Sequence, residues 1–221
     1  MKRRTLLAAG GGAVVALGAG WMLTRPDPAT GLLPGAANAQ TTDGSAPEII
    51  EMVKGNPEAP VELIEYASYT CPHCASFHAN QFKLIEQNYI DTDKVKFVYR
   101  EVYFDRPGLW ASMIARATND ANFFFAFSDI LYQRQREWLA SGDPAQIIQE
   151  LRTLAKTAGL DDATLDAVLS DAAKAEALYT WYQDNAQRDG INSTPSFIID
   201  GRGYSNMAYD EFAEVLDGKL G

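Results

Sequence analysis

The chain has 221 residues, with 19 Lys or Arg against 29 Asp or Glu, and a formal net charge of −10 at pH 7. Nucleic acid and anionic lipid both require a basic protein surface, so this balance argues against either as a partner. The length suffices for one well-packed domain, or for one domain that carries an insertion.

The N-terminus resembles an export signal. Basic residues at positions 2–4 precede an uncharged, mostly apolar stretch over residues 6–23, and Ala37-Asn38-Ala39 has the small residues that a signal peptidase accepts. Residues 1–39 are therefore expected to be a signal peptide. An uncleaved N-terminal anchor is the alternative, because the apolar stretch approaches the ~20 residues that span a bilayer. Arg3-Arg4 also leaves twin-arginine export open. Residues 40–48 are expected to form a flexible tether.

The next part of the chain predicts a strand–helix–strand unit. Residues 61–67 form an apolar run typical of a strand buried on both faces. Residues 72–90 have helical spacing, residues 95–104 alternate like a strand, and a shorter strand is expected at 49–53. Two strands joined by a helix-length connection predict a parallel pair.

The middle of the chain is different in character. Residues 109–188 have helical spacing and no convincing strand. Asp143 before Pro144 predicts a helix start, and Asp161 or Asp162 is expected to cap the next helix. Six aromatic residues here either form the core of a helical subdomain, as is more common, or line a peptide groove. They are Phe123, Phe124, Phe125, Phe127, Tyr132 and Trp138.

Sheet character returns near the C-terminus. The predicted elements are strands at 196–200 and 202–205, followed by a helix at 208–220. The order predicts an α/β fold in which helices flank a mixed central sheet. Residues 49–107 and 189–221 would form this domain, and residues 108–188 an all-helical insertion.

The two cysteines of the chain, Cys71 and Cys74, follow directly on the strand predicted at 61–67. Structural disulfides stabilise most when they close long loops, and a pair three positions apart constrains almost nothing. The pair therefore indicates a reactive dithiol. If Cys71 lies at a helix start, unpaired N–H groups and the helix dipole favour its thiolate and lower its pKa.

The residues around the two cysteines fit this interpretation. Pro72 suits a first helical turn because it lacks the N–H that would be unpaired there. The His73 ring can donate to the Cys71 sulfur or place positive charge beside it. Cys74 lies one turn further on the same side of the helix, within disulfide reach, and is expected to be more buried.

Two other interpretations of the dithiol stay open, a metal site and an inert buried pair. The only other candidate ligands of the Cys or His type are His73 and His78, and a zinc site usually needs four ligands in two separated pairs. His73 stands between the thiols and cannot easily turn toward the same metal. His78 is expected to be a surface or core-edge helix residue, and neither a metal nor a cofactor is expected.

Residues 65–74, Glu-Tyr-Ala-Ser-Tyr-Thr-Cys-Pro-His-Cys, resemble the active site of the DsbA family, periplasmic disulfide oxidoreductases with a thioredoxin fold. Residues 193–197, Ser-Thr-Pro-Ser-Phe, resemble the cis-proline loop of that fold, and the length of the insertion also fits. The resemblance covers roughly residues 48–221. It implies that Cys71 is the nucleophile and Cys74 the resolving cysteine. It also implies that Pro195, in cis after Thr194, presents backbone groups to an extended substrate peptide.

Glu65 is a carboxylate within an apolar strand, where burial is costly unless the group is paired or protonated. The DsbA family carries a buried acid at this distance before its nucleophile. The hypothesis is that Glu65 relays a proton to or from Cys74, with Lys96 or Arg100 as its partner. The alternative is that Glu65 points to an exposed edge.

The resemblance implies an enzyme that donates its Cys71–Cys74 disulfide to cysteines of newly translocated proteins through a mixed disulfide at Cys71. It also implies reoxidation by a DsbB-like, quinone-coupled membrane partner. A monomer is expected, because residues 40–48 are too short for the N-terminal dimerisation domain of DsbC-type isomerases. The alternatives are an isomerase or reductase on the same fold, since these also use Thr before the cis proline, and a dithiol metallochaperone or assembly factor.

Overall fold

The computed structural model describes residues 46–221. The predicted export signal, and all but the last three residues of the predicted tether, lie outside this range. Within the described range, no helix combines the length and the apolar character needed to cross a membrane.

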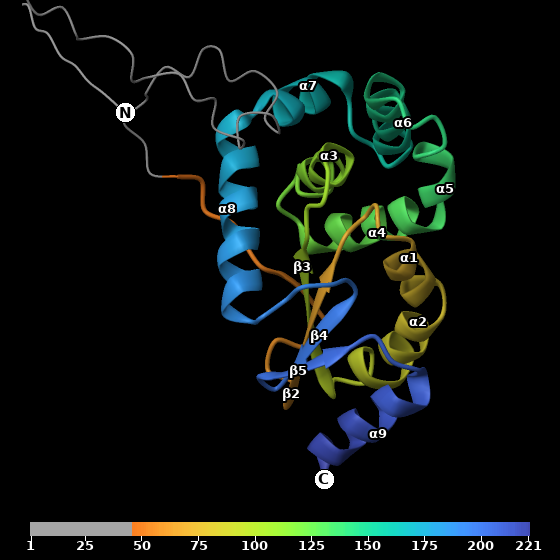
Figure 1. The fold of residues 1–221 in the computed structure, drawn as a ribbon, viewed down its shortest axis with the longest axis vertical. Helices are drawn as coiled ribbons and strands as arrows, with labels where there is room; N and C mark the ends of the chain where they lie inside the picture. Colours follow the sequence, from red (N-terminus) through yellow and green to blue (C-terminus); the bar gives the residue numbers. More distant parts are fainter. Residues whose placement is uncertain (1–45) are drawn as a thin grey trace, which may run out of the picture.

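A five-stranded mixed sheet forms the centre of the fold, with strand order β1-β3-β2-β4-β5 (Figure 1). The strands are β1 (Met52–Lys54), β2 (Val61–Ala67), β3 (Val95–Glu101), β4 (Ser196–Ile199) and β5 (Arg202–Ser205). The central strand β2 is parallel to β3 and antiparallel to β4, and the other pairs are antiparallel. The predicted parallel strand–helix–strand unit is therefore confirmed.

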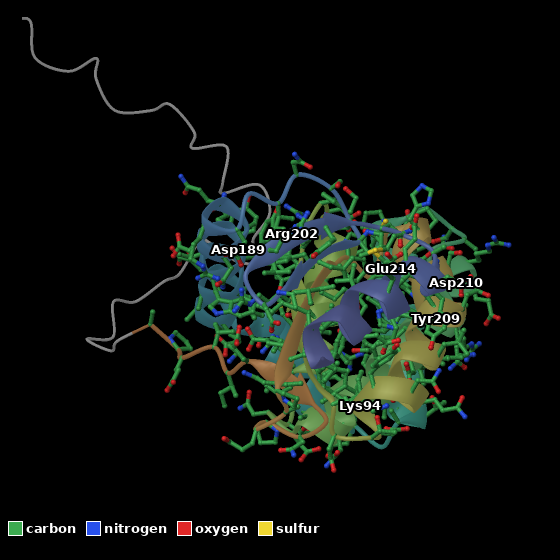
Figure 2. All side chains as sticks on the ribbon, turned by 90° about the horizontal axis from the view of Figure 1, so that it is seen from below. Lys94, Asp189, Arg202, Tyr209, Asp210 and Glu214 are labelled. Atoms are coloured by element: carbon green, nitrogen blue, oxygen red, sulfur yellow. The ribbon has the colours of Figure 1, made fainter. Side chains whose placement is uncertain are left out.

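Helices cover both faces of the sheet, and six of them, α3 to α8, lie between β3 and β4 in the sequence. They are α1 (Pro72–Ala79), α2 (Gln81–Ile85), the π-helix η2 (Glu86–Ile90), α3 (Arg106–Ala115), α4 (Ala121–Gln133), α5 (Gln135–Trp138), α6 (Pro144–Thr157), α7 (Asp162–Ser170), α8 (Ala172–Arg188) and α9 (Tyr209–Leu220). Figure 1 shows α8 on one side of the sheet and α1, α2 and α9 on the other. Figure 2 shows Tyr209, Asp210 and Glu214 along α9, and Asn88 of η2 donates a hydrogen bond to the Tyr209 hydroxyl at 2.7 Å.

The alternation of side chains along β2 explains why this strand is apolar throughout. Leu63 and Ala67 belong to the large core under α1, α2 and α9, whereas Ile64 and Tyr66 pack with Ala186 of α8. Successive side chains of a strand point to opposite faces, so a strand covered on both sides has to be apolar at nearly every position.

Several predicted boundaries differ from the structure, most of them by one to three residues. The first strand is Met52–Lys54 rather than 49–53. It ends just before Gly55, where a φ of +87° and the close approach of Ile90 exclude a side chain. The third strand ends at Glu101 rather than 104, shortly before the cap of α3. The single helix predicted at 72–90 is interrupted at Asn80, where φ and ψ are −121° and −79°. Periodicity does not reveal a break at one residue.

The segment between β3 and β4 is helical, as predicted. Asp143 and Asp161 accept hydrogen bonds from backbone N–H groups at the starts of α6 and α7, which confirms both predicted caps. Five of the six aromatic residues singled out in this segment are buried, and the sixth, Phe123, is half-buried and stacks on Phe127. They form core rather than a groove.

A buried ion pair ties the helical segment to the sheet. Arg116, which follows α3, donates to both carboxylate oxygens of Glu101 at the end of β3, at 2.5 and 2.7 Å. Both side chains are 1% exposed. Arg116 also donates to the carbonyl of Ile50 at 2.7 Å, so one guanidinium joins three segments that are distant in sequence.

Replacing Arg116 with Met is expected to lower the free energy of unfolding by about 3–5 kcal/mol, because Glu101 would remain buried without a partner. Unfolding in guanidinium chloride measures this loss. Arg152→Met is the matched control, since Arg152 pairs with the exposed carboxylates of Asp162 and Asp166 and its loss is expected to change the midpoint little. Equal losses in the two variants would contradict the structural role given to the buried pair.

Candidate active site

The two cysteines lie where the central strand passes into a helix. After β2 ends at Ala67, a short turn brings Cys71 to the N-cap of α1 with φ −81° and ψ 119°, and Pro72 is the first helical residue. The N–H of Cys71 donates to the carbonyl of Ser68 at 3.1 Å. Cys71 is half-buried and Cys74 is fully buried. The structure therefore places both residues as predicted.

Side chains from the helical segment hold this turn in place. The Gln135 amide of α5 donates to the carbonyls of both Tyr69 and Cys71, at 2.9 Å each. Thr70 donates through its hydroxyl to Asp105, the cap of α3, at 2.9 Å. The Tyr69 carbonyl thus gains a partner, and the Cys71 carbonyl, which also accepts from the N–H of Ala75 at 3.2 Å, gains a second one next to the reactive sulfur. The role of Gln135 is not predictable from the sequence, because no local pattern marks an amide whose partner carbonyl lies 64 residues away.

The opposite wall of the site is the loop before β4. The Thr194–Pro195 peptide bond is cis, as the resemblance implied. The Thr194 carbonyl lies 3.5 Å from the Cys71 sulfur and accepts a hydrogen bond from the thiol. The Thr194 hydroxyl is buried, and it acts on the charge of the Cys71 sulfur. This loop therefore brings both a carbonyl and a hydroxyl to the first cysteine.

The environment of Cys71 favours its thiolate. A hydrogen bond from the Cys74 thiol is the main cause, and the Thr194 side chain and the backbone N–H groups of Cys74 and His73 add to it. Together they outweigh the effect of burial and lower the pKa of Cys71 to about 5. The helix start thus contributes as predicted, although the second thiol contributes more. His73 is exposed and acts on Cys71 through its backbone N–H.

The environment of Cys74 has the opposite effect. Burial, the hydrogen bond to Cys71 and the negative charge of Glu65 all raise the pKa of the Cys74 thiol, far above its usual range. The two sulfurs of one motif are therefore held in different protonation states, with Cys71 as thiolate and Cys74 as thiol at neutral pH.

Glu65 is fully buried, which excludes the exposed-edge alternative, but both partners predicted for it are wrong. Lys96 donates to Glu62 at 2.6 Å, and Arg100 donates to Glu51 at 2.7 Å and to Asp189 at 2.9 Å. The reason lies in the sheet register. Glu65 is opposite Tyr99, so the neighbouring even-numbered side chains of β3 point to the other face.

The partner of Glu65 is His78 of α1. Its Nε2 lies 3.0 and 3.2 Å from the two carboxylate oxygens, and the ring stacks on Tyr132 with centroids 4.3 Å apart. Of the two positions predicted for His78, the surface is wrong and the edge of the core is right, since the residue is 7% exposed and lines a cavity beside Lys83 and Glu86. A signal was present in the sequence: His78 follows Cys74 by four residues and so shares its helix face.

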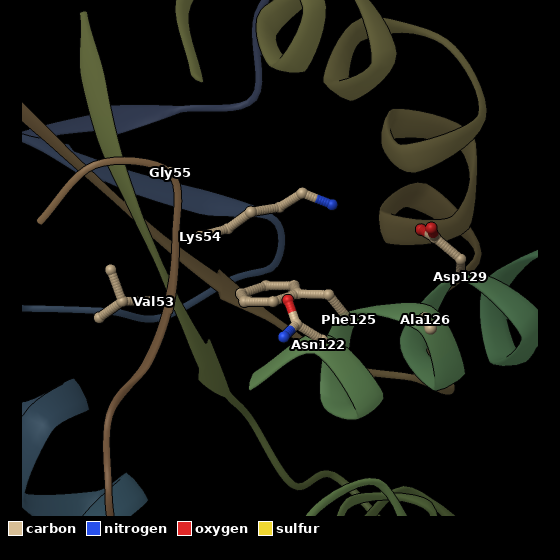
Figure 3. A pocket seen from close by; sticks show the side chains of 7 residues that line it. All are labelled: Val53, Lys54, Gly55, Asn122, Phe125, Ala126 and Asp129. Atoms are coloured by element: carbon tan, nitrogen blue, oxygen red, sulfur yellow. The ribbon is translucent and has the colours of Figure 1, made fainter. Parts of the chain in front are cut away.

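A cavity of about 340 Å³ lies elsewhere, between β1 and α4 (Figure 3). Figure 3 shows Lys54 and Asp129 reaching toward each other across it, above the ring of Phe125. Neither cysteine lines this cavity.

Comparison with known proteins agrees with the geometry of the dithiol site. A family model described as Thioredoxin matches residues 48–218. The chain belongs to the thioredoxin family. Within this family it resembles the solved structure of alpha-DsbA1 from Wolbachia pipientis, with a TM-score of 0.69 and 26% identity over 79% of this chain and 92% of that one. The fold is thus the DsbA-like thioredoxin fold that the sequence predicted.

Two relatives carry names that describe disulfide chemistry. A putative protein-disulfide oxidoreductase of Rickettsia bellii (strain RML369-C) is 31% identical over 167 residues, which cover 76% of this thioredoxin-family chain and 63% of the relative. Disulfide bond formation protein D of Bacillus subtilis (strain 168) is 26% identical over 179 residues, with 76% of each chain covered. The chain thus spans less than two thirds of the length of the Rickettsia relative.

Titration of the reduced protein is expected to show one thiolate with a pKa of about 5, assigned to Cys71, and no ionisation of Cys74 at neutral pH. Ultraviolet absorbance of the thiolate measures both. Cys71→Ser should remove the transition near pH 5, which serves as its control. A Cys71 thiol that titrates like a free cysteine, near ~8.5, would contradict the account of the site.

The same shift makes the stability of the reduced form depend on pH. The folded pKa of about 5 lies below the unfolded value of ~8.5, so ionised Cys71 stabilises the reduced protein fully above ~8.5 and not below about 5. The melting temperature of the reduced form, relative to the oxidised form, should therefore fall as the pH decreases from about 8 to about 5. The oxidised form is the control, because its sulfurs do not titrate. A constant difference would contradict the lowered pKa.

Proposed function

We propose that the protein is an exported thiol:disulfide oxidoreductase that donates its Cys71–Cys74 disulfide to cysteines of newly translocated proteins. The observation that carries the proposal is the opposite protonation of the two sulfurs. A stabilised Cys71 thiolate stabilises the reduced enzyme, and a stable reduced form makes the disulfide a strong oxidant. The name of the Rickettsia relative and the DsbA-like fold support the same chemistry.

The proposed reaction has two exchange steps. A substrate thiolate attacks the Cys71 sulfur, the Cys71–Cys74 bond breaks, and Cys74 leaves and takes up a proton because its pKa is raised. A second substrate thiolate then attacks the substrate sulfur of the mixed disulfide. This forms the substrate disulfide and releases Cys71 as a thiolate. Its low pKa makes Cys71 a good leaving group.

The walls of the site suit an extended substrate. The loop of Thr194 and Pro195 brings backbone groups to the Cys71 sulfur. An exposed aromatic side chain is available as well. Phe104, between β3 and α3, is 58% exposed and precedes Asp105, which accepts the hydrogen bond of Thr70 next to the dithiol. Backbone groups beside the nucleophile would bind a peptide main chain irrespective of its side chains. Broad specificity for unfolded, cysteine-containing proteins follows from such binding.

Glu65 is the proposed proton donor and acceptor for Cys74. Its charge acts on the Cys74 thiol, and it is buried in the layer beneath the dithiol. When Cys74 leaves as a thiolate, Glu65 supplies the proton. When Cys74 must attack a mixed disulfide during reoxidation, Glu65 accepts it.

The proposed location is the bacterial periplasm, either soluble after signal cleavage or tethered by an N-terminal anchor. The basic and apolar residues before position 39 support export. The oxidant that regenerates the disulfide is proposed to be a DsbB-like, quinone-coupled membrane protein, so the enzyme itself needs no cofactor beyond its two sulfurs. The enzyme is proposed to act as a monomer.

A redox titration against glutathione tests the direction of electron flow. The expected reduction potential is less negative than about −200 mV, and the oxidised protein should oxidise a reduced dithiol peptide. Cys74→Ser should accumulate a mixed disulfide when its Cys71 thiolate attacks the oxidised, disulfide-bonded peptide, and Cys71→Ser should form none. A potential near thioredoxin's ~−270 mV would instead support the reductase, and stoichiometric metal on the purified reduced protein would support the metallochaperone.

Glu65→Gln tests the proton role. Gln keeps a hydrogen-bonding group beside His78 but does not exchange protons, so the rate at which Cys74 resolves a mixed disulfide at neutral pH should fall about tenfold. Stopped-flow measurements across a pH series give this rate and its profile. Glu62→Gln is the matched control, a carboxylate of the same strand that pairs with Lys96 on the other face. An unchanged pH profile in Glu65→Gln would contradict the relay.

A further inference from the structure

Gln135 is a buried amide whose two N–H donors both reach the loop that carries the nucleophile. They contact the carbonyls of Tyr69 and Cys71 at 2.9 Å each. Tyr69 is 1% exposed, so bulk water does not reach its carbonyl. Within residues 46–221 the Gln135 amide is the only hydrogen-bond donor to that carbonyl. A buried carbonyl without a partner is unfavourable, so the position of this loop depends on Gln135.

The short helix that carries Gln135 is itself fixed in the core. Trp138, at the end of α5, is fully buried and donates its indole N–H to the carbonyl of Leu131 at 2.9 Å. The Gln135 carbonyl accepts from the N–H of Leu139 at 3.2 Å. Ordering a long polar side chain costs conformational entropy, and a fixed backbone on both sides limits that cost. Gln135 is therefore a fixed donor rather than a mobile surface group.

The position of the loop decides which groups the Cys71 sulfur meets. Backbone N–H groups of His73 and Cys74 face the sulfur from the start of α1, and the Thr194 carbonyl lies 3.5 Å away on the opposite wall. Hydrogen bonds weaken steeply when their angles fall below ~120°. A small movement of the loop would therefore weaken several of these interactions at once.

We propose that Gln135 is a positioning residue, which holds the Cys71 loop at the start of α1 and thereby makes the disulfide a stronger oxidant. The inference rests on the function proposed above. Gln135 makes no hydrogen bond to either sulfur and acts through the backbone of Tyr69 and Cys71.

Loss of the Gln135 amide has a definite consequence for the redox equilibrium. The Tyr69 carbonyl would lose its partner, and the loop would relieve this by moving toward water. The Cys71 thiolate would then lose aligned hydrogen-bond donors. Because this thiolate exists only in the reduced protein, the reduced form would become less stable relative to the disulfide. The reduction potential would become more negative.

Gln135→Met tests the role, because Met is similar in length to Gln and lacks the N–H donors. A tenfold loss of thiolate stabilisation is expected, which raises the pKa of Cys71 from about 5 to about 6. At pH 7 the same tenfold change makes the reduction potential about 30 mV more negative. Titration against glutathione and the ultraviolet absorbance of the thiolate measure the two effects. Gln135→Asn, whose amide is one methylene shorter, should shift both in the same direction by less.

The matched control is Gln133→Met. Gln133 is exposed, lies two residues earlier at the end of α4, and makes no hydrogen bond to the Cys71 loop in the part of the chain that the structure describes. This variant should keep the potential of the parent protein and its Cys71 pKa.

A purely structural role for Gln135 predicts a different result. Gln135→Met would then lower the melting temperatures of the oxidised and reduced forms equally and leave the potential and the Cys71 pKa unchanged, which would overturn the proposal. If Gln135→Met does not fold, Gln135→Asn carries the test, and a parent-like potential in that variant would overturn it. A parent protein whose Cys71 titrates like free cysteine would instead overturn the proposed function.

Discussion

The unequal placement of the two sulfurs is the constraint on which the site depends. Cys71 is half-exposed at the start of α1 and Cys74 is buried one turn later, so a single shared proton has a strongly preferred side. The surrounding structure maintains this difference between the two sulfurs in burial and in protonation. The central position of β2 buries the second sulfur, and the Thr194 loop and the first N–H groups of α1 stabilise charge on the first. A dithiol with equal sulfurs would have no preferred direction of exchange.

The sequence predicted the features that depend on local pattern. The apolar run of β2, the dithiol after it and Pro72 at the first helical position are all set by neighbouring residues, and all three are found as expected. The cis bond before Pro195 came from family resemblance, since a proline by itself does not indicate a cis bond. The burial of Glu65 followed from its apolar neighbours, but its partner did not. That choice depends on the register of β2 against β3, which decides the face to which each side chain points.

Two buried carboxylates of neighbouring strands illustrate how the choice of partner determines what a charge can do. Glu101 is paired with Arg116, whose guanidinium does not lose its proton, and this pair is a fixed link between sheet and helices. Glu65 is paired with His78, and histidine is the type of side chain that exchanges protons near neutral pH. The first pair can serve stability alone. The second places a proton-exchanging type of side chain beneath the reactive thiol.

The contacts of Gln135 bear on whether the Cys71–Cys74 motif would work in another protein. Its amide reaches from α5 to two carbonyls of the loop that carries the nucleophile, so the geometry of the first cysteine is partly specified by a helix encoded more than sixty residues later. Transferring the four-residue motif to a smaller protein without these helices would transfer the two cysteines but not the hydrogen bonds that position their loop. The reactivity of the dithiol therefore depends on the helical segment as well as on the cysteines themselves.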